Sequence, residues 1–356
     1  SRDKLPFCFH LSQRGLNWPD LPWSVTSAMI PTVTLPGMAR PTTAVGFGCN
    51  SLLGPRSRRE GLSLLAEAYE AGVRHFDVAR AYSSGDAEGV LGEFLSTRRD
   101  SSTLTTKFGI QPPRAGGIGM RSAKAVARKL MRFFPRYRKA LGARASHRLQ
   151  GGAYSVEEAR ASLETSLREL RTERIEVFLA HEASASDCSP ELAAYLLEEM
   201  AAGRIGAFGV GSGFDRVPEI VRERPEFAQV LQFNSGVVHR NLEALSPPSS
   251  SFTITYGAIG SELRGLRAYF EAHPDVVSRW SKALGLDLTD VSGTLAPLLL
   301  ASSLHANAGG VVLFSSTRRK TIRENLRAIA DERFPPDQLE LFGTLSREAA
   351  QTPDME

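Results

Sequence analysis

The feature that most constrains the fold of this chain is the repeated alternation of short apolar strand patterns with helical patterns. Strands are predicted at the start of segment 44–54 and at residues 73–77, 102–107, 175–181, 205–210, 230–233, 252–256 and 311–315. Helices are predicted at residues 58–71, 86–97, 156–170, 190–202, 216–222 and 321–330, with a shorter helical stretch at 242–245. Because such alternation favours parallel pairing, the pattern predicts an α/β fold closed as a (β/α)8 barrel, the TIM barrel.

The length of the chain is compatible with one barrel domain. Its 356 residues suggest two domains by length alone, but α/β barrels of this size form a single domain. We predict an N-terminal extension at residues 1–36, a barrel domain at residues 37–345 and a C-terminal tail at residues 346–356. The extension has no clear hydrophobic period, so we expect little regular structure in it. A long basic insertion, residues 111–150, follows the third strand.

Composition and cysteine usage are those of an ordinary globular protein, with 42% hydrophobic and 23% charged residues. No apolar run is long enough to span a bilayer, and no signal-peptide pattern stands near the start. Cys8, Cys49 and Cys188 are isolated in the sequence, so they form no metal-spaced pair and indicate a reducing compartment. These observations predict a cytoplasmic protein without a metal site.

Positive charge is concentrated in the insertion. It contains eleven Lys or Arg and no Asp or Glu, so the net charge of +4 becomes −7 when the insertion is left out. The basic character of the chain therefore belongs to one segment. It does not indicate a nucleic-acid-binding surface on the fold as a whole.

Titratable side chains stand at the ends of three successive predicted strands. Asp77 ends the first of these strands, and Tyr82 follows it closely. Lys107 ends the second, and His181 ends the third. In a parallel barrel these strand ends lie on the face where the chemistry takes place. Each residue alone is more often structural than catalytic, but four titratable types converging on one face indicate an active site.

Three segments around these residues resemble motifs of the aldo-keto reductase family. Residues 76–82 (FDVARAY) resemble its Phe-Asp-x-Ala-x-x-Tyr pattern, and residues 105–109 (TTKFG) resemble its lysine strand. Residues 162–181 (SLETSLRELRTERIEVFLAH) resemble its helix-to-histidine segment. The resemblance runs from about residue 35 to about residue 330. It implies a catalytic tetrad of Asp77, Tyr82, Lys107 and His181.

The predicted chemistry is reversible carbonyl reduction. No side chain donates hydride, so a nicotinamide cofactor must supply it. Tyr82 is the expected proton donor, or the base for oxidation. A phenol has an ordinary pKa of about 10, and we expect Lys107, held by Asp77, to lower the pKa of Tyr82 towards neutrality. We expect His181 to donate a hydrogen bond to the carbonyl oxygen as negative charge develops there.

The resemblance also implies contacts to the nicotinamide half of the cofactor. The loop after the first strand, with Gly48, Cys49 and Asn50, is expected to line this end of the site. Its Gly-Phe-Gly is not a dinucleotide fingerprint, because the third glycine and the helix start are misplaced. Later strand ends are expected to contribute Gln232 to the carboxamide, Tyr256 by stacking, and Ser212 where the family usually has Ser-Asn.

A basic turn before the last predicted helix resembles the adenosine-phosphate site of the family. Its residues are Ser316, Thr317, Arg318, Arg319 and Lys320. Because a helix N-terminus disfavours cations, this crowding indicates an anionic ligand such as a 2′-phosphate, and the alternative is a solvated basic turn. Glu324 and Asn325 match the pair that contacts adenine, but Thr321 replaces the usual arginine, which weakens the NADP(H) preference. We expect NADP(H), with NAD(H) as the alternative cofactor.

The sequence therefore predicts an NADP(H)-dependent oxidoreductase of the aldo-keto reductase type. Its substrate would be a small aldehyde, ketone or sugar that the enzyme reduces. The direction could also be reversed, so that the enzyme acts as a sugar dehydrogenase. The alternative is a cofactor-binding regulatory protein on the same fold, like the channel β subunits of the family. Steady turnover of simple carbonyls would separate the two.

Three interpretations of the basic insertion stay open. Part of it, residues 122–133, has apolar residues near helical spacing beside a basic surface. It leaves the barrel after the Lys107 strand, on the predicted catalytic face. It is interpreted as a lid that attracts an anionic substrate, as a solvated or surface-packed loop, or as a docking element for an anionic membrane or partner protein.

Overall fold

Eight parallel strands close into a barrel in the residues that the computed structural model describes, 29–53, 56–112 and 153–350. Around the barrel lie β3 (Val45–Gly48), β4 (His75–Asp77), β5 (Thr103–Phe108), β6 (Ile175–His181), β7 (Ile205–Gly211), β8 (Val230–Asn234), β9 (Phe252–Tyr256) and β10 (Val311–Phe314). β10 pairs with both β9 and β3, which closes the sheet. The predicted (β/α)8 barrel is confirmed.

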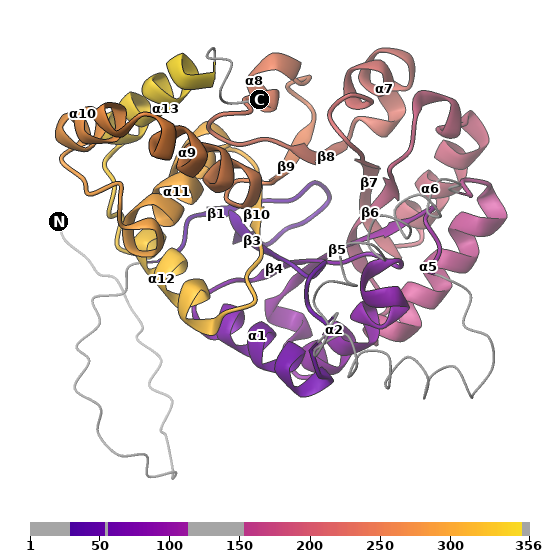
Figure 1. Ribbon diagram of the computed structural model, residues 1–356. Coiled ribbons are helices and arrows are strands. Elements are labelled where there is room, and N and C mark those ends of the chain that lie inside the picture. Colours follow the sequence, from indigo (N-terminus) through magenta and orange to yellow (C-terminus); the bar gives the residue numbers. More distant parts are fainter. Residues whose placement is uncertain (1–28, 54–55, 113–152, 351–356) are drawn as a thin grey trace, which may run out of the picture.

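Helices surround the strands, as Figure 1 shows. They are α1 (Arg58–Glu70), α2 (Ala87–Leu95), α5 (Val156–Leu170), α6 (Pro190–Ala201), α7 (Val217–Glu223), α8 (Asn241–Leu245), α9 (Gly260–Ala272), α10 (Pro274–Leu284), α11 (Ala296–Ala306), α12 (Arg319–Ala330) and α13 (Pro336–Ala350). α8 is a five-residue helix, as short as the sequence predicts. The apolar helix faces pack against the barrel or against neighbouring helices and form one continuous core with it.

Local capping signals fix where several helices begin. Ser57 accepts a hydrogen bond from the backbone N–H of Glu60, whose carboxylate accepts one from the backbone N–H of Ser57 in return. This capping box starts α1 at the predicted residue. The hydroxyl of Ser155 caps α5 by accepting a hydrogen bond from the backbone N–H of Glu158, so that α5 spans the predicted range.

A small hairpin precedes the first barrel strand and closes the barrel at the N-terminal ends of its strands. It consists of the antiparallel strands β1 (Thr32–Val33) and β2 (Thr42–Thr43) and the loop between them. Leu35 in its loop is 1% exposed and packs inside the barrel with Val177 and Val230. The last residues of segment 1–36, predicted to have little regular structure, therefore form a strand and part of the core, while residues 1–28 lie outside the described residues.

The C-terminal side of the molecule differs from the expectation in helix content. α9, α10 and α11 lie between β9 and β10, where no helix was predicted. α11 is apolar over most of its surface, so it has no amphipathic period to recognise. α13 packs against α10 and α11 and continues past residue 345, with Ser346 and Ala349 buried. The predicted tail from residue 346 therefore begins inside a helix.

Most of the basic insertion, and with it the lid, loop and docking interpretations, lies outside the described residues. Its first residue, Gln111, is described and donates to Glu158 and Ser162 on α5. Within the described ranges, no helix has the length and apolar character that crossing a bilayer requires.

Candidate active site

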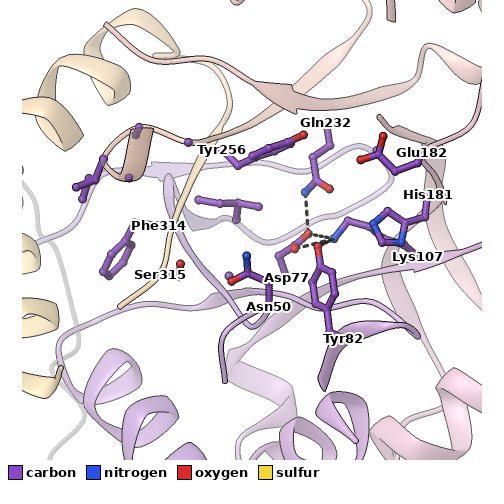
Figure 2. A pocket seen from close by; sticks show the side chains of 17 residues that line it. Asn50, Asp77, Tyr82, Lys107, His181, Glu182, Gln232, Tyr256, Phe314 and Ser315 are labelled. Atoms are coloured by element: carbon purple, nitrogen blue, oxygen red, sulfur yellow. Dashed lines mark hydrogen bonds and ion pairs between the residues drawn. The ribbon is translucent and has the colours of Figure 1, made fainter. Parts of the chain in front are cut away.

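A cavity of about 390 Å³ opens at the C-terminal ends of the barrel strands (Figure 2). All eight strands contribute a lining residue at or near their last position. The predicted tetrad lines this cavity, with Asp77 from β4, Tyr82 from the following turn, Lys107 from β5 and His181 from β6. The structure thus brings together the four side chains that the sequence placed at strand ends.

Lys107 is the centre of the hydrogen-bond network in the cavity. Its Nζ lies 2.7 Å from Oδ1 and 2.8 Å from Oδ2 of Asp77, and 3.1 Å from the carbonyl oxygen of Val78. The same nitrogen lies 3.4 Å from the hydroxyl oxygen of Tyr82. The Lys107 and Asp77 side chains are only 2% and 4% exposed. Each charge of such a buried pair depends on the other, because removing one partner leaves the remaining charge without compensation.

Gln232 extends the network across the barrel. Its Nε2 donates a hydrogen bond of 2.7 Å to Oδ2 of Asp77, so β8 supports a carboxylate on β4. Gln232 also lines the cavity. The sequence predicts that this amide contacts the cofactor carboxamide, and the structure adds a second task, the fixing of Asp77.

The pKa of Tyr82 lies above its ordinary value, so the expected lowering towards neutrality is wrong for this structure. Burial raises the pKa first, the positive charge of Lys107 lowers it, and the negative charge of Asp77 raises it again. For Lys107, burial alone would lower the pKa, but Asp77 and then Tyr82 outweigh burial and raise it. Because Asp77 neutralises the ammonium, Lys107 cannot offset the loss of water around the phenol. Tyr82 is therefore a protonated phenol beside an ammonium group.

His181 is a neutral ring at the cavity wall. Burial, and then the charge of Lys107, lower the pKa of His181 to about 3. Its ring lies edge-on to the ring of Tyr82, with centroids 5.8 Å apart. Its Nδ1 is buried with no hydrogen-bond partner among the described residues. The hydroxyl of Tyr154 donates to the backbone carbonyl of His181 at 2.6 Å and so fixes the strand end.

The segment that carries Tyr82 is held in an uncommon backbone conformation. Tyr82 begins a 3₁₀ turn, and the two serines after it have left-handed backbones, with φ of 54° and 60°. Such conformations cost free energy in residues with a Cβ, so the surroundings must enforce them. Glu88 on α2, 1% exposed, accepts hydrogen bonds from Arg80 in this segment and from Thr106 on β5. This carboxylate ties the Tyr82 segment to the barrel.

Four of the six residues predicted around the nicotinamide line the cavity, and two do not. The four that line it are Gly48, Asn50, Gln232 and Tyr256. Cys49 is fully buried in the core, because consecutive residues of an extended segment point to opposite sides. Ser212 is also fully buried, and its hydroxyl donates to the carbonyl oxygen of Ala183 at 2.9 Å.

The basic turn before α12 lies beyond the cavity, which ends at Ser315. Arg319 Nε and Arg323 Nη1 each lie 2.6 Å from a carboxylate oxygen of Glu67 on α1. The Glu67 side chain is 4% exposed, whereas both arginine side chains are 56% exposed. Arg319, predicted to bind a cofactor phosphate, is thus already paired with a carboxylate.

The other residues predicted at the adenosine end remain near the start of α12. The hydroxyl of Ser316 accepts from the backbone N–H of Arg318, and Thr317 and Arg318 are exposed. Glu324 pairs with Lys320 at 3.5 Å. Asn325 is 1% exposed, and its Oδ1 has no hydrogen-bond partner among the described residues. A buried amide oxygen without a partner is costly, so a donor from outside the chain is expected there.

The residues present fit a nicotinamide cofactor. The flat Tyr256 ring and the polar Asn50 and Gln232 side chains line the cavity beside the tetrad. From there the lining continues through Phe314 and Ser315 towards α12. The partnerless Asn325 oxygen on α12 suits a hydrogen bond from an adenine amino group.

Several lining residues were not predicted. Phe314 and Ser315 follow the rule that identified Tyr256, since they end a barrel strand, and that rule could have found them. The residues from Gly257 to Gly260 line the cavity where α9 begins, a helix that the sequence did not reveal. Glu182 lines it directly after His181, and strand alternation argues against that placement.

The described residues form no metal centre. Among them, no cluster of three or more His, Cys, Asp and Glu side chains could hold an ion. Cys49 and Cys188 are buried and unpaired. Burial first, and then the charge of Asp187, raise the pKa of the Cys188 thiol to about 12, and burial also raises the pKa of Cys49. Both are neutral thiols in the core.

Solved structures with the same fold come from several bacteria. An aldo-keto reductase from Bacillus halodurans, solved in its holo form, superposes with a TM-score of 0.63 at 17% identity, over 92% of this chain and 100% of that one. A glycerol dehydrogenase from Gluconobacter oxydans has a TM-score of 0.59 at 16% identity, over 86% and 96%. At these identities the likeness shows the fold alone.

Sequence comparison identifies the family. Residues 44–234 match the model of the aldo/keto reductase family. A probable aldo-keto reductase of Glycine max is 25% identical over 346 residues, 89% of this chain and 90% of that protein. A D-threo-aldose 1-dehydrogenase of a Pseudomonas species is 29% identical over 210 residues, 55% of this chain and only 58% of that relative. The chain belongs to the aldo/keto reductase family, whose members are oxidoreductases that use nicotinamide cofactors.

Proposed function

We propose that this chain is an NADP(H)-dependent oxidoreductase that interconverts a small carbonyl compound and its alcohol, with Tyr82 as the proton donor and acceptor. The observation that carries the proposal is the buried Lys107–Asp77 pair, whose ammonium lies 3.4 Å from the Tyr82 hydroxyl at the cavity wall. A buried ion pair adds little net stability compared with apolar packing. Its position beside a phenol in a cavity supports a chemical role.

In the direction of reduction, Tyr82 transfers its proton to the carbonyl oxygen as that oxygen gains negative charge. The nicotinamide, when bound, supplies hydride to the carbonyl carbon. Lys107 stabilises the phenolate that remains, and Asp77 keeps the ammonium in position. His181, whose pKa is about 3, is neutral and donates a ring N–H to the same oxygen. In the direction of oxidation, the Tyr82 phenolate takes the proton of the alcohol.

The preference for NADP(H) rests on the basic residues around the start of α12. Exposed Arg318 and Lys320 support binding of the 2′-phosphate. Glu67 opposes it, because this carboxylate already pairs with Arg319 and Arg323. Of the charges predicted to favour NADP(H), Arg318 is therefore the strongest candidate for the phosphate contact.

Substrates that carry hydroxyl groups are the first class to test. One sequence relative is a D-threo-aldose 1-dehydrogenase, and one structural relative is a glycerol dehydrogenase. A screen of aldehydes, ketones, sugars and polyols with NADPH, NADH, NADP⁺ and NAD⁺, followed at the nicotinamide absorbance, tests the proposed activity.

The role of Tyr82 is tested by Tyr82→Phe. We expect kcat to fall by about 10²- to 10⁴-fold, the usual contribution of general acid catalysis, with cofactor binding unchanged. Tyr195→Phe is the matched control, because Tyr195 lies on α6 and does not line the cavity. Retention of near-wild-type kcat in Tyr82→Phe would contradict the proposal. Tight cofactor binding without turnover of any carbonyl or alcohol would instead support the regulatory alternative.

A further inference from the structure

Glu182 is an acidic side chain in the cavity for which the proposed reaction has no use. The described residues that line the cavity include three charged side chains, Asp77, Lys107 and Glu182. Asp77 and Lys107 neutralise each other at 2.7 Å. Because His181 is neutral, Glu182 gives the described lining a net negative charge.

The backbone turns Glu182 into the cavity. Consecutive residues of a strand point to opposite faces, so the residue after His181 would normally point away from the side that His181 faces. Glu182 instead has a left-handed backbone, with φ of 57°, and both side chains line the cavity. Figure 2 shows the Glu182 and His181 side chains on the same side of the cavity. A left-handed conformation is unfavourable for any residue with a Cβ, so this placement is held by other contacts.

Those contacts leave part of the carboxylate available. Oε2 of Glu182 accepts a hydrogen bond of 3.2 Å from the backbone N–H of Gly213 and lies 4.0 Å from Arg216 Nη1. The side chains of Glu182 and Arg216 are 42% and 44% exposed, so this ion pair is weak. Oε1 has no hydrogen-bond partner among the described residues. It is an open acceptor in the cavity that the tetrad also lines.

The charge of Glu182 reaches the opposite wall. Burial first, and then the negative charge of Glu182, raise the pKa of the Tyr256 hydroxyl. A carboxylate in such a position attracts hydroxyl donors and repels anions. A substrate with a carboxylate or phosphate near its carbonyl group would meet this repulsion, whereas a neutral hydroxylated substrate would gain a charge-assisted hydrogen bond.

We propose that Glu182 is a specificity residue that accepts a hydrogen bond from a hydroxyl group next to the reacting carbon, so that the enzyme selects neutral hydroxyaldehydes and polyols over anionic carbonyl compounds. This inference rests on the proposed function, since it concerns the substrate of that same site. Glu182 takes no part in the proton transfer.

The test compares three aldehydes of similar size: glyceraldehyde with two hydroxyl groups, propanal with none, and glyoxylate with a carboxylate. In Glu182→Ala we expect kcat/KM to fall roughly tenfold or more for glyceraldehyde and to stay within about twofold for propanal. In Glu182→Gln, which keeps the shape and removes the charge, we expect glyoxylate to improve several-fold. Glu219→Ala, an exposed site on α7 outside the cavity, is the control. An equal loss for glyceraldehyde and propanal would mean that Glu182 only holds its loop, and would overturn the proposal.

A binding measurement separates this inference from the proposed activity. Saturation-transfer NMR with glycerol and with 1-propanol needs no turnover. We expect a weaker glycerol signal in Glu182→Ala than in the wild type, with the 1-propanol signal unchanged. Equal glycerol signals in both proteins would overturn the role of Glu182 even if the enzyme turns over. Absence of turnover with every aldehyde would instead count against the proposed function, and the glycerol comparison would still decide the role of Glu182.

Discussion

The two ends of the proposed cofactor path hold their charges in opposite ways. In the barrel cavity, Lys107 and Asp77 are almost fully buried and lie 2.7 Å apart. At the start of α12, Arg319 and Arg323 are 56% exposed, and only their partner, Glu67, is buried. Both regions contain short ion pairs, yet water reaches one of them and is excluded from the other.

Because of this difference in burial, substitutions in the two regions are expected to have different effects. In the cavity, the buried charges of Lys107 and Asp77 depend on each other, so a single change to either has large effects on stability and chemistry together. At α12, water screens the arginines, so changes there have small effects on stability and act mainly on ligand affinity. Four experiments test this contrast, from the largest expected effect to the smallest.

The first experiment, Lys107→Met, removes one partner of the buried ion pair in the cavity. It leaves Asp77 charged and without its main partner, so we expect a loss of about 3–5 kcal/mol of unfolding free energy and a fall in kcat of about 10²-fold or more. The double variant Asp77→Asn/Lys107→Met, which removes both charges, should recover much of the stability and none of the activity. Urea unfolding and nicotinamide absorbance measure the two effects. Equal stability of the single and double variants would contradict the ion-pair account.

The second experiment uses pH to probe the buried interior. His75 is fully buried inside the barrel, and burial, followed by the charge of Lys107, lowers its pKa from an ordinary 6.5 to about 3. Between pH 6.5 and about pH 3, His75 is therefore protonated in the unfolded chain and neutral in the folded chain. Stability is lost as pH falls from about 6.5 to about 3, by about 1.4 kcal/mol per pH unit for each such histidine. His181 adds a second contribution of the same sign.

His75→Asn isolates one of these contributions. We expect the variant to lose stability less steeply than the wild type between pH 6.5 and pH 5, because one of the two proton-binding steps is gone. Urea unfolding at pH 7, 6 and 5 measures the slope. Parallel slopes for the two proteins would show that His75 does not carry this linkage.

The third experiment, Glu67→Gln, removes the negative charge that pairs with the exposed arginines of α12. The amide cannot compensate the charges of Arg319 and Arg323, and since both are half exposed we expect a stability loss of only about 1–2 kcal/mol. With these arginines freed, affinity for NADPH should rise several-fold while affinity for NADH stays the same. Calorimetric titration of both cofactors measures this. Glu70→Gln, an exposed acid on the same helix, is the control, and equal changes for NADPH and NADH would argue against the role of Glu67.

The smallest effects are expected from the arginines themselves. Arg318→Ala should weaken NADPH binding by roughly tenfold or less and leave NADH binding unchanged, because only NADPH carries the extra phosphate. Arg319→Ala should weaken it less, since Glu67 already holds that guanidinium. Arg327→Ala, near the other end of α12, is the control. A larger loss for Arg319→Ala than for Arg318→Ala would reverse the assignment.

Local patterns were sufficient to predict the barrel and the convergence of the tetrad. β6 and α5 span the predicted residues because their signals are local: an apolar strand run for β6, and the Ser155 cap for α5. Asp77, Lys107 and His181 needed no knowledge of long-range contacts to be grouped, because successive parallel strands end on one face of a barrel. The sequence alone therefore determined the fold class and the convergence of the four tetrad side chains.

Only the tertiary structure decided how water, distance and backbone strain act on those side chains. The pairing of Arg319 with Glu67 joins residues 252 positions apart, and no local pattern encodes it. The raised pKa of Tyr82 depends on burial, which is set by packing from all sides. Glu182 lines the cavity because its backbone is left-handed, whereas strand alternation predicts a side chain that points away from the cavity. Sequence periodicity gives the direction of a side chain within its own element, whereas desolvation and contacts between distant elements exist only once the chain has folded.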